Sequence, residues 1–330
     1  MIEHLAGMLG FRCHWANYPW GSDYYTRQGE MMPADGLDRL RAADAVFLGA
    51  IGHPDVPDHV TLWGLLIPIR RSFAQYLNVR PVRSFAGVRG PLRPDLGQDI
   101  DMLIVRENNE GEYSEIGGRL YAGTADELAV QEAVFTRRGV DRTLAAAFGY
   151  AAARRGQLTS ATKSNGIIHT MPFWDERVAQ MSPQYPDVTV DKMHIDALCA
   201  RLVLEPAKFD VIVGSNLFGD ILSDLAAAVV GSIGIAPSGN IDPTRKFPSM
   251  FEPVHGSAPD IAGQGIANPV GQIWSGAMML RHLGEERAAD MLERAIAVVL
   301  DDAGVLTPDL GGRAGTRDVT DAIIGALGTQ

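Results

Sequence analysis

The sequence predicts an α/β fold with parallel strands, divided into two domains. Short β-rich runs alternate along the chain with segments of helical periodicity, an order typical of parallel strands joined by crossover helices. A chain of 330 residues is long enough to bury a large core and to form two domains. Its hydrophobic fraction of 46% and charged fraction of 21% are ordinary for a globular enzyme.

Hydrophobic patterning places the strands and helices along the chain. Strands are expected at 44–49, 101–106, 158–162 and 209–213, with a further strand-like run at 11–15. Helices are expected at 63–77, 140–155, 171–182, 195–204, 216–230, 270–283, 285–301 and 317–328. Residues 112–137 break this rhythm, because alternating segments occur there without a long helix between them. We interpret them as a β-hairpin arm, which is only marginally stable alone and should therefore pair with the same arm of a second subunit.

Composition disfavours several classes of protein. A net charge of −11 argues against nucleic acid and anionic membranes as partners, since both require a basic surface. The two cysteines, Cys13 and Cys199, provide neither a disulfide framework nor a thiolate metal site. No apolar run has the length needed to span a bilayer, and the first residues lack the basic start and apolar core of a signal peptide. We therefore expect a cytoplasmic protein with no membrane partner.

The most informative run is Asn-Leu-Phe-Gly-Asp-Ile-Leu-Ser-Asp at 216–224. If it is helical, Asp220 and Asp224 lie one turn apart on the same face. Two like charges there repel each other, so a positive charge should lie between them, and hard cations such as Mg²⁺ or Mn²⁺ take oxygen ligands. A solvated acidic face is the alternative. The flanks favour a metal site, because the pair opens a helix directly after a buried strand, where open α/β sheets bind ligands.

Three arginines occur in strongly patterned surroundings, and together they suggest a site for a carboxylate. They are Arg70, Arg80 and Arg106. Arg106 ends a buried strand, where an unpaired guanidinium would be costly. The planar guanidinium binds a carboxylate with two parallel hydrogen bonds. Any one of the three alone would more often form a structural salt bridge, so the prediction rests on the set.

Three further side chains are candidates for chemistry, each with a plainer alternative. Lys163 follows a strand and could act as a base if its pKa falls, or it could be a solvated loop lysine. Tyr113 could donate a proton or lie partly buried in the core. Asp196 stands at a helix start, where it could be an ordinary N-cap.

The loop at 252–263, Glu-Pro-Val-His-Gly-Ser-Ala-Pro-Asp-Ile-Ala-Gly, is rich in small residues and could wrap a nucleotide through backbone groups. Asp260 could accept hydrogen bonds from ribose hydroxyls and would repel a 2′-phosphate, which favours NAD over NADP. Neither a G-x-G-x-x-G run nor a G-x-x-x-x-G-K-[ST] run occurs, so neither a Rossmann fingerprint nor a P-loop is predicted.

These residues match a known family. From about Asp44 to the C-terminus the sequence resembles the decarboxylating β-hydroxyacid dehydrogenases, the isocitrate and isopropylmalate dehydrogenase family. The 216–224 run, followed by Gly-Ser-Ile-Gly at 231–234, looks like the family signature. Further runs look most like members that act on D-malate or tartrate: Leu-Trp-Gly at 62–64, Arg-Glu-Asn-Asn-Glu-Gly-Glu-Tyr-Ser at 106–114, Lys-Ser-Asn-Gly at 163–166, and Pro-Phe-Trp-Asp-Glu at 172–176.

The resemblance implies roles for these residues. Arg70, Arg80 and Arg106 would bind a substrate carboxylate. Asp220 and Asp224, with Asp196 of the partner subunit, would hold Mg²⁺ or Mn²⁺. Lys163 of the partner subunit would help to remove the hydroxyl proton as hydride passes to the nicotinamide, and Tyr113 would assist protonation of the enol. The adenosine half of NAD would be bound by His255, Gly256, Ser257, Ala258, Asp260 and Asn268.

The resemblance also implies an isopropylmalate dehydrogenase-like two-domain fold with a β-arm. The larger, cofactor-side domain would comprise 1–75 and 231–330, and the smaller domain 76–230, with the dimerisation arm at about 112–137. Active sites would be shared across a homodimer. Family members begin with a core strand and a Gly-Asp-Gly-Ile-Gly-like turn, which this sequence lacks, so we expect roughly 20–25 residues of a βα unit to be missing.

Competing hypotheses for the function remain. The leading one is NAD- and metal-dependent oxidation, with decarboxylation, of a small 2-hydroxy dicarboxylic acid, D-malate or tartrate. Isopropylmalate is an alternative substrate, because the apolar residues 65–67 lie just before Arg70, whereas Trp63 and residues 110–113 count against it. A dimeric homologue that lost turnover with its N-terminal strand is the alternative of another class, and the intact Lys163 argues against it.

Overall fold

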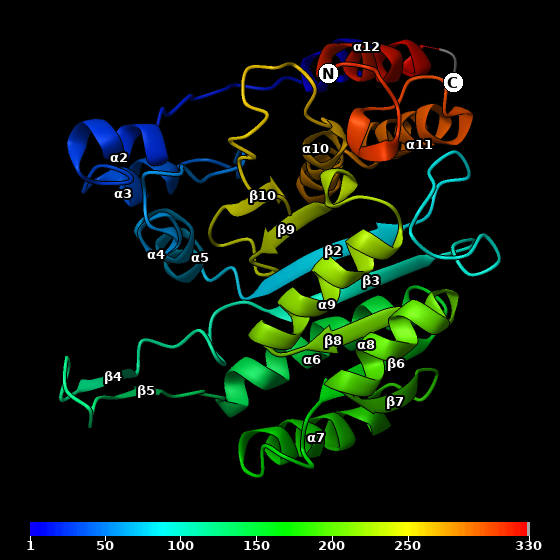
Figure 1. The fold of residues 1–330 in the computed structure, drawn as a ribbon. Helices are drawn as coiled ribbons and strands as arrows, with labels where there is room; N and C mark the ends of the chain where they lie inside the picture. The colour runs from blue at the N-terminus through cyan, green and yellow to red at the C-terminus, as the bar shows by residue number, and fades with distance from the viewer. Residues whose placement is uncertain (329–330) are drawn as a thin grey trace. The chain divides into compact units, whose positions relative to one another are not determined.

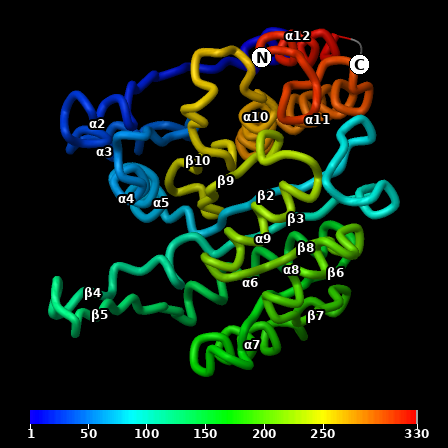
Figure 2. Tube along the Cα trace, in the orientation of Figure 1, coloured from blue at the N-terminus to red at the C-terminus, as the bar shows by residue number. Residues whose placement is uncertain are grey.

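The computed structural model describes residues 1–328 and divides into two compact units (Figures 1 and 2). Of the described residues, unit 1 contains 1–75, 83–99 and 227–328. Unit 2 contains residues 76–82 and 100–226. The predicted domains, 1–75 with 231–330 and 76–230, differ from these units at residues 83–99 and 227–230, which lie in unit 1.

The strands of unit 1 lie in the order β1, β10, β9. β1 (Ala45–Phe47) runs parallel to β10 (Ser249–Pro253), and β10 runs antiparallel to β9 (Pro237–Ile241). Every residue of β9 and β10 is buried. The carboxyl ends of β1 and β10 therefore meet at one edge of the sheet, and the loop predicted to bind the cofactor begins there.

Within residues 1–328, eight α-helices belong to unit 1. They are α1 (Ile2–Leu9), α2 (Ser22–Gln28), α3 (Gly36–Leu40), α4 (Asp58–Thr61), α5 (Ile67–Ser72), α10 (Val270–Leu283), α11 (Glu286–Asp302) and α12 (Thr316–Leu327), with a π-helical turn at Leu62–Leu66 between α4 and α5. α10 packs against β9 and β10. It ends where Gly284 adopts a left-handed conformation with φ of 94°, which glycine does without a Cβ clash.

Unit 2 is built on strands in the order β2, β3, β8, β6, β7. They are β2 (Leu77–Arg83), β3 (Asp101–Glu107), β8 (Val211–Gly214), β6 (Gln157–Thr162) and β7 (Thr189–His194). β3, β8, β6 and β7 run parallel, and β8 is buried along its whole length, as expected of a central parallel strand. Their carboxyl ends share one edge, which carries Arg106 and Lys163.

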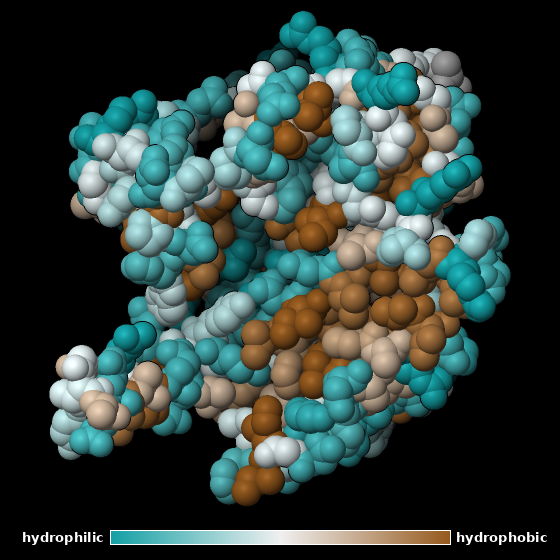
Figure 3. All heavy atoms as spheres, in the orientation of Figure 1, coloured by the Kyte–Doolittle hydropathy of each residue, from teal (hydrophilic) through white to brown (hydrophobic). Residues whose placement is uncertain are grey.

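Four α-helices begin in unit 2. They are α6 (Arg137–Ala152), α7 (Thr170–Met181), α8 (Ile195–Leu204) and α9 (Asn216–Val229). Single 3₁₀ turns occur in the two units at Ser182–Gln184, Pro206–Lys208, Ile233–Ile235 and Pro308–Leu310. α8 and α9 expose the apolar side chains of Val203, Leu204 and Ile221, and Figure 3 shows apolar residues gathered over these helices.

The predicted β-hairpin arm is present and extends away from the rest of unit 2 (Figure 1). β4 (Gly117–Leu120) pairs antiparallel with β5 (Leu128–Gln131), and Leu120 stands opposite Leu128. All residues of both strands are exposed. Exposed apolar side chains on the arm include Leu120, Tyr121, Leu128 and Val130.

Several details of the sequence prediction are wrong. The strand-like run at 11–15 is irregular in the structure, and the helix expected to reach residue 77 ends at Ser72. β2 was not among the predicted strands, and its sequence contains Pro81, a residue that is unusual inside a strand. β7, β9 and β10 were missed as well. Within residues 1–328, no helix is long and apolar enough to cross a membrane.

Candidate active site

Two buried arginines of unit 2 converge on Asp220. Arg80 lies on β2 and Arg106 at the end of β3, and their side chains are 8% and 3% exposed. Arg80 NH2 lies 3.2 Å from Asp220 Oδ1, and Arg106 NH1 donates to the same oxygen. The other carboxylate oxygen accepts a hydrogen bond of 3.0 Å from the Tyr113 hydroxyl. The structure therefore brings together four of the residues that the sequence predicted for the site.

Asp224 lies one turn further along α9, on the same side of the helix. Arg80 NH1 lies 3.3 Å from Asp224 Oδ1 and donates a hydrogen bond of 2.6 Å to Ser223 Oγ. Burial raises the pKa of Asp224, Arg80 opposes this rise, and the negative charge of Asp220 adds to it. Burial, followed by the charge of Asp220, likewise raises the pKa of Tyr113. The tyrosine therefore stays protonated near neutral pH and can donate a proton.

The chemistry of these donors fits a hard divalent cation. Asp220 and Asp224 offer oxygen ligands only, which Mg²⁺ and Mn²⁺ prefer. Within residues 1–328, no group of three or more His, Cys, Asp or Glu side chains is placed to hold a metal ion. A cation held by Asp220 and Asp224 would therefore need further oxygen ligands from outside this pair.

Asn216 and Glu112 were missed by the sequence prediction, although both bind the residues around the cluster. Asn216 Oδ1 accepts hydrogen bonds of 3.0 and 2.6 Å from Arg106 Nε and NH2. Glu112 accepts from Ser215 Oγ at 2.8 Å and from the backbone N–H of Leu217 at 3.1 Å. The start of α9 is thereby tied to the loop that carries Tyr113. The available signal for Asn216 was its place at the start of the 216–224 run, directly after a strand. The prediction used only the aspartates of that run.

Glu107, next to Arg106, is a fully buried acid. Its carboxylate accepts hydrogen bonds from the backbone N–H groups of Asn109 and Glu110, at 3.0 and 2.8 Å. Burial raises the pKa of Glu107 from 4.5 to about 7, even though these two N–H donors favour the charged form. The folded state therefore binds this proton more tightly than the unfolded chain does.

Glu107→Gln is expected to alter how stability depends on pH. The stabilisation from the protonated acid is fully present below pH 4.5 and is lost as the pH rises through about 7. The variant lacks this titration, so the wild-type free energy of unfolding should fall relative to the variant by roughly 3 kcal/mol across that window. Urea unfolding at pH 4.5 and pH 7.5 measures this difference. Parallel pH dependences of the two proteins would contradict it.

Lys163 and Asp196 form a separate pair in unit 2. Lys163 follows β6, Asp196 lies in the first turn of α8 after β7, and Lys163 Nζ stands 2.7 Å from Asp196 Oδ1. The hydrogen bond from Lys163 lowers the pKa of Asp196. The side chains are 29% and 68% exposed, so both can reach a ligand or a second protein surface.

Arg70, the third predicted arginine, belongs to unit 1. It lies in the last turn of α5 and pairs with Glu252 of β10, with Arg70 NH2 and Glu252 Oε1 2.9 Å apart. Both side chains are 10% exposed.

The loop after β10 has features that suit a nucleotide. His255 Nδ1 lies 2.8 Å from Gly256 O, which requires that Nδ1 carry the proton. Nε2 is then an acceptor in the neutral ring, and it is buried without a hydrogen-bond partner among the described residues. Gly52, with φ of 135°, lies where a Cβ would stand 3.0 Å from Ser257 Oγ. The loops after β1 and β10 therefore lie in close contact, and His255 Nε2 is an unpaired acceptor beside this contact.

The remaining predicted cofactor residues lie in the same region of unit 1. Asn268 Oδ1 accepts from the backbone N–H of Val270 at 3.0 Å, and its Nδ2 donates to Asp309 Oδ2 at 3.0 Å. Asn268 is a buried residue, and its side chain therefore fixes the start of α10. Asp260 is exposed. Asp309 was not singled out from the sequence, because Ser232 and Asn268, two of its hydrogen-bond partners, lie far away along the chain.

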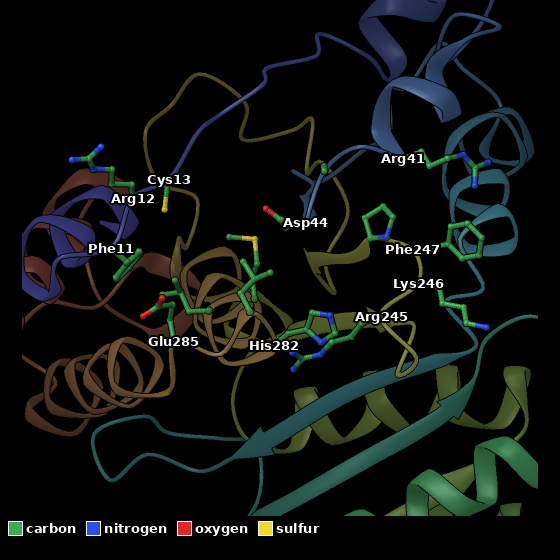
Figure 4. Close-up of a pocket in the computed structure, with 15 residues that line it drawn as sticks. Phe11, Arg12, Cys13, Arg41, Asp44, Arg245, Lys246, Phe247, His282 and Glu285 are labelled. Atoms are coloured by element: carbon green, nitrogen blue, oxygen red, sulfur yellow. The ribbon is translucent and has the colours of Figure 1, made fainter.

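A cavity of about 450 Å³ in unit 1 contains none of the predicted site residues (Figure 4). Its lining includes the basic side chains of Arg41, Arg245 and Lys246 together with Asp44 and Glu285. The candidate chemistry therefore lies elsewhere.

Comparison with known proteins shows the family. The model of the isocitrate/isopropylmalate dehydrogenase family matches residues 1–323. The chain is 54% identical over 329 residues to a probable tartrate dehydrogenase/decarboxylase of Agrobacterium vitis, covering 99% of this chain and 90% of that one. It is 54% identical over 331 residues to the decarboxylating D-malate dehydrogenase of Escherichia coli, covering 98% and 91%.

A solved structure supports the same assignment. The isocitrate dehydrogenase of Methylococcus capsulatus is similar with a TM-score of 0.88 and 35% identity, covering 98% of this chain and 94% of that one. Family model, relatives and fold agree over nearly the whole length. The chain belongs to the isocitrate/isopropylmalate dehydrogenase family and is a decarboxylating dehydrogenase.

Proposed function

We propose that this protein catalyses the NAD- and divalent-metal-dependent oxidation of a small 2-hydroxy dicarboxylic acid, D-malate or tartrate, with decarboxylation of the product. The observation that carries this proposal is the convergence of Arg80, Arg106 and Tyr113 on Asp220, one turn from Asp224. Two arginines that can bind a carboxylate thus lie beside two aspartates that can bind a hard cation. The names of the relatives, tartrate and D-malate dehydrogenases, support the choice of substrate.

Substrate binding uses the arginines and the aspartates together. Arg80 and Arg106, with Arg70, bind the substrate carboxylates through their guanidinium groups. Asp220 and Asp224, with Asp196 of the partner subunit, hold Mg²⁺ or Mn²⁺. The cation, when bound, supplies Lewis acidity to the hydroxyl and the adjacent carboxylate of the substrate. Asn216 keeps Arg106 in place, because its side-chain oxygen binds two nitrogens of that guanidinium.

Proton transfers belong to Lys163 and Tyr113. Lys163 of the partner subunit would accept the proton of the 2-hydroxyl, and NAD, when bound, would supply the hydride acceptor. Oxidation places a ketone β to a carboxylate, so the C–C bond to that carboxylate breaks and CO₂ leaves. Tyr113 then donates its proton to the enol, a role that suits its protonated state near neutral pH.

The cofactor proposal rests on the loop after β10. His255, Gly256, Ser257, Ala258, Asp260 and Asn268 bind the adenosine half of NAD. The orphaned His255 Nε2 is an acceptor for a nucleotide hydroxyl or amino group. The carboxylate of Asp260 would repel a 2′-phosphate, which favours NAD over NADP.

The protein is proposed to act as a cytoplasmic homodimer with shared active sites. The exposed apolar side chains of the arm would be covered when two arms pair, and so would Val203, Leu204 and Ile221 on α8 and α9. In that arrangement, the Lys163–Asp196 pair of one subunit would complete the Asp220–Asp224 site of the other.

Isopropylmalate is the less favoured substrate on structural grounds. An isopropyl group needs an exposed apolar pocket, for which residues 65–67 were the candidates. Leu65 and Leu66 are instead packed in the core of unit 1, in a cluster that includes Ile69, Phe73 and Met250. These two side chains therefore pack in the core and do not form an open pocket for an isopropyl group.

The proposal is tested by the rate of NADH formation with D-malate, tartrate and 3-isopropylmalate, each with Mn²⁺. We expect the highest kcat/KM with D-malate or tartrate. A clear preference for isopropylmalate would overturn the choice of substrate. The absence of turnover with every 2-hydroxy acid tried would overturn the enzyme proposal and favour a non-catalytic homologue.

A further inference from the structure

Glu252 occupies a junction between three parts of unit 1. It lies near the carboxyl end of β10, two residues before the loop proposed to bind NAD. Its Oε1 accepts hydrogen bonds from Arg70 NH2 of α5 at 2.9 Å and from Asn240 Nδ2 of β9 at 2.8 Å. Its backbone oxygen lies 2.8 Å from Ser275 Oγ of α10. One residue therefore binds two helices and the neighbouring strand.

We infer that Glu252 is a positioning residue that orients Arg70 for the substrate carboxylate, an inference that rests on the proposed function. Glu252 neutralises this buried cation through the 2.9 Å ion pair, and Arg70 Nε has no hydrogen-bond partner among the described residues. A guanidinium is planar, so a bond that fixes NH2 also fixes the direction in which NH1 points. Asn240 in turn fixes the carboxylate from the other side.

The same contact ties substrate binding to the cofactor loop. The backbone of Glu252 leads into residues 254–258, and it is anchored by Ser275 Oγ at the Glu252 oxygen and by the 3.0 Å hydrogen bond from Val254 N–H to Ala236 O. A change in the carboxylate should therefore weaken the substrate site first. A smaller effect on NAD binding should follow.

The test is a double-mutant cycle of Glu252→Gln and Arg70→Ala, read by D-malate affinity in calorimetry with Mn²⁺ and by KM. Glu252→Gln should weaken D-malate binding on the order of 10-fold in the Arg70 background. In the Arg70→Ala background it should add almost nothing, because it acts through Arg70. Additive losses, or unchanged D-malate affinity in Glu252→Gln, would overturn the inference. So would a wild-type protein that binds no D-malate.

Matched controls separate positioning from stability. Asp210 is another buried carboxylate paired with an arginine, Arg154, at 2.8 Å in unit 2. Asp210→Asn should lower the Tm and leave D-malate affinity unchanged. If Glu252→Gln does not fold, Glu252→Asp keeps the charge but shortens the reach, and it should weaken D-malate binding at a near wild-type Tm. Binding without turnover in the wild type would contradict the proposed function but leave the cycle valid.

Discussion

Replacing Asp220 with asparagine is expected to lower kcat/KM by at least about 1000-fold, since metal-assisted charge stabilisation supplies several kcal/mol. The change removes one carboxylate of the proposed metal pair. It also removes the shared acceptor of Arg80, Arg106 and Tyr113. The initial rate of NADH formation across a Mn²⁺ titration measures both the loss and the shift in metal requirement.

The matched control is Asp141→Asn. Asp141 is another helical aspartate paired with an arginine, with Arg177 Nε and NH2 at 2.6 and 2.9 Å, and it lies outside the proposed site. We expect near wild-type kinetics for this control. An Asp220→Asn enzyme that keeps more than about a tenth of wild-type kcat/KM, with the same Mn²⁺ dependence, would refute the role of Asp220.

Mixing two inactive variants is expected to restore activity if the active site is shared. Lys163→Met should lower kcat by about 100-fold or more through loss of the proton acceptor. A heterodimer of Lys163→Met and Asp220→Asn subunits contains one site in which the intact Asp220 of one chain meets the intact Lys163 of the other. Purified heterodimer should therefore show about half the wild-type activity.

The control for complementation combines Asp220→Asn with Asp224→Asn. Both changes lie on the same side of the shared site, so neither site of that heterodimer is intact and no activity should return. Heterodimers of Lys163→Met and Asp220→Asn that are no more active than their parents would show that Lys163 and Asp220 act within one chain.

Local patterns predicted much of the fold. α8 and α10 occur at the predicted limits, 195–204 and 270–283, because each has a clear apolar periodicity and a defined start. The hairpin arm was recognised from alternation over a region with no helix. β2 was not predicted; most of its residues are buried, and Pro81 interrupts the pattern typical of a strand.

The site was predictable where chemistry is local. The spacing of Asp220 and Asp224 alone places them on one helical face. Arg106 was a candidate because a buried guanidinium at the end of a strand needs a partner. Glu252 and Arg70 are 182 residues apart in sequence, and Glu112 and Ser215 are 103 apart. Such pairs depend on how the chain folds, and no spacing rule reveals them.

The most direct test of the central claim is product stoichiometry with D-malate. The account predicts one NADH and one CO₂ for each pyruvate formed, with the rate abolished by a chelator and restored by Mn²⁺. NADH formation without CO₂ release, or turnover that is indifferent to the chelator, would contradict it.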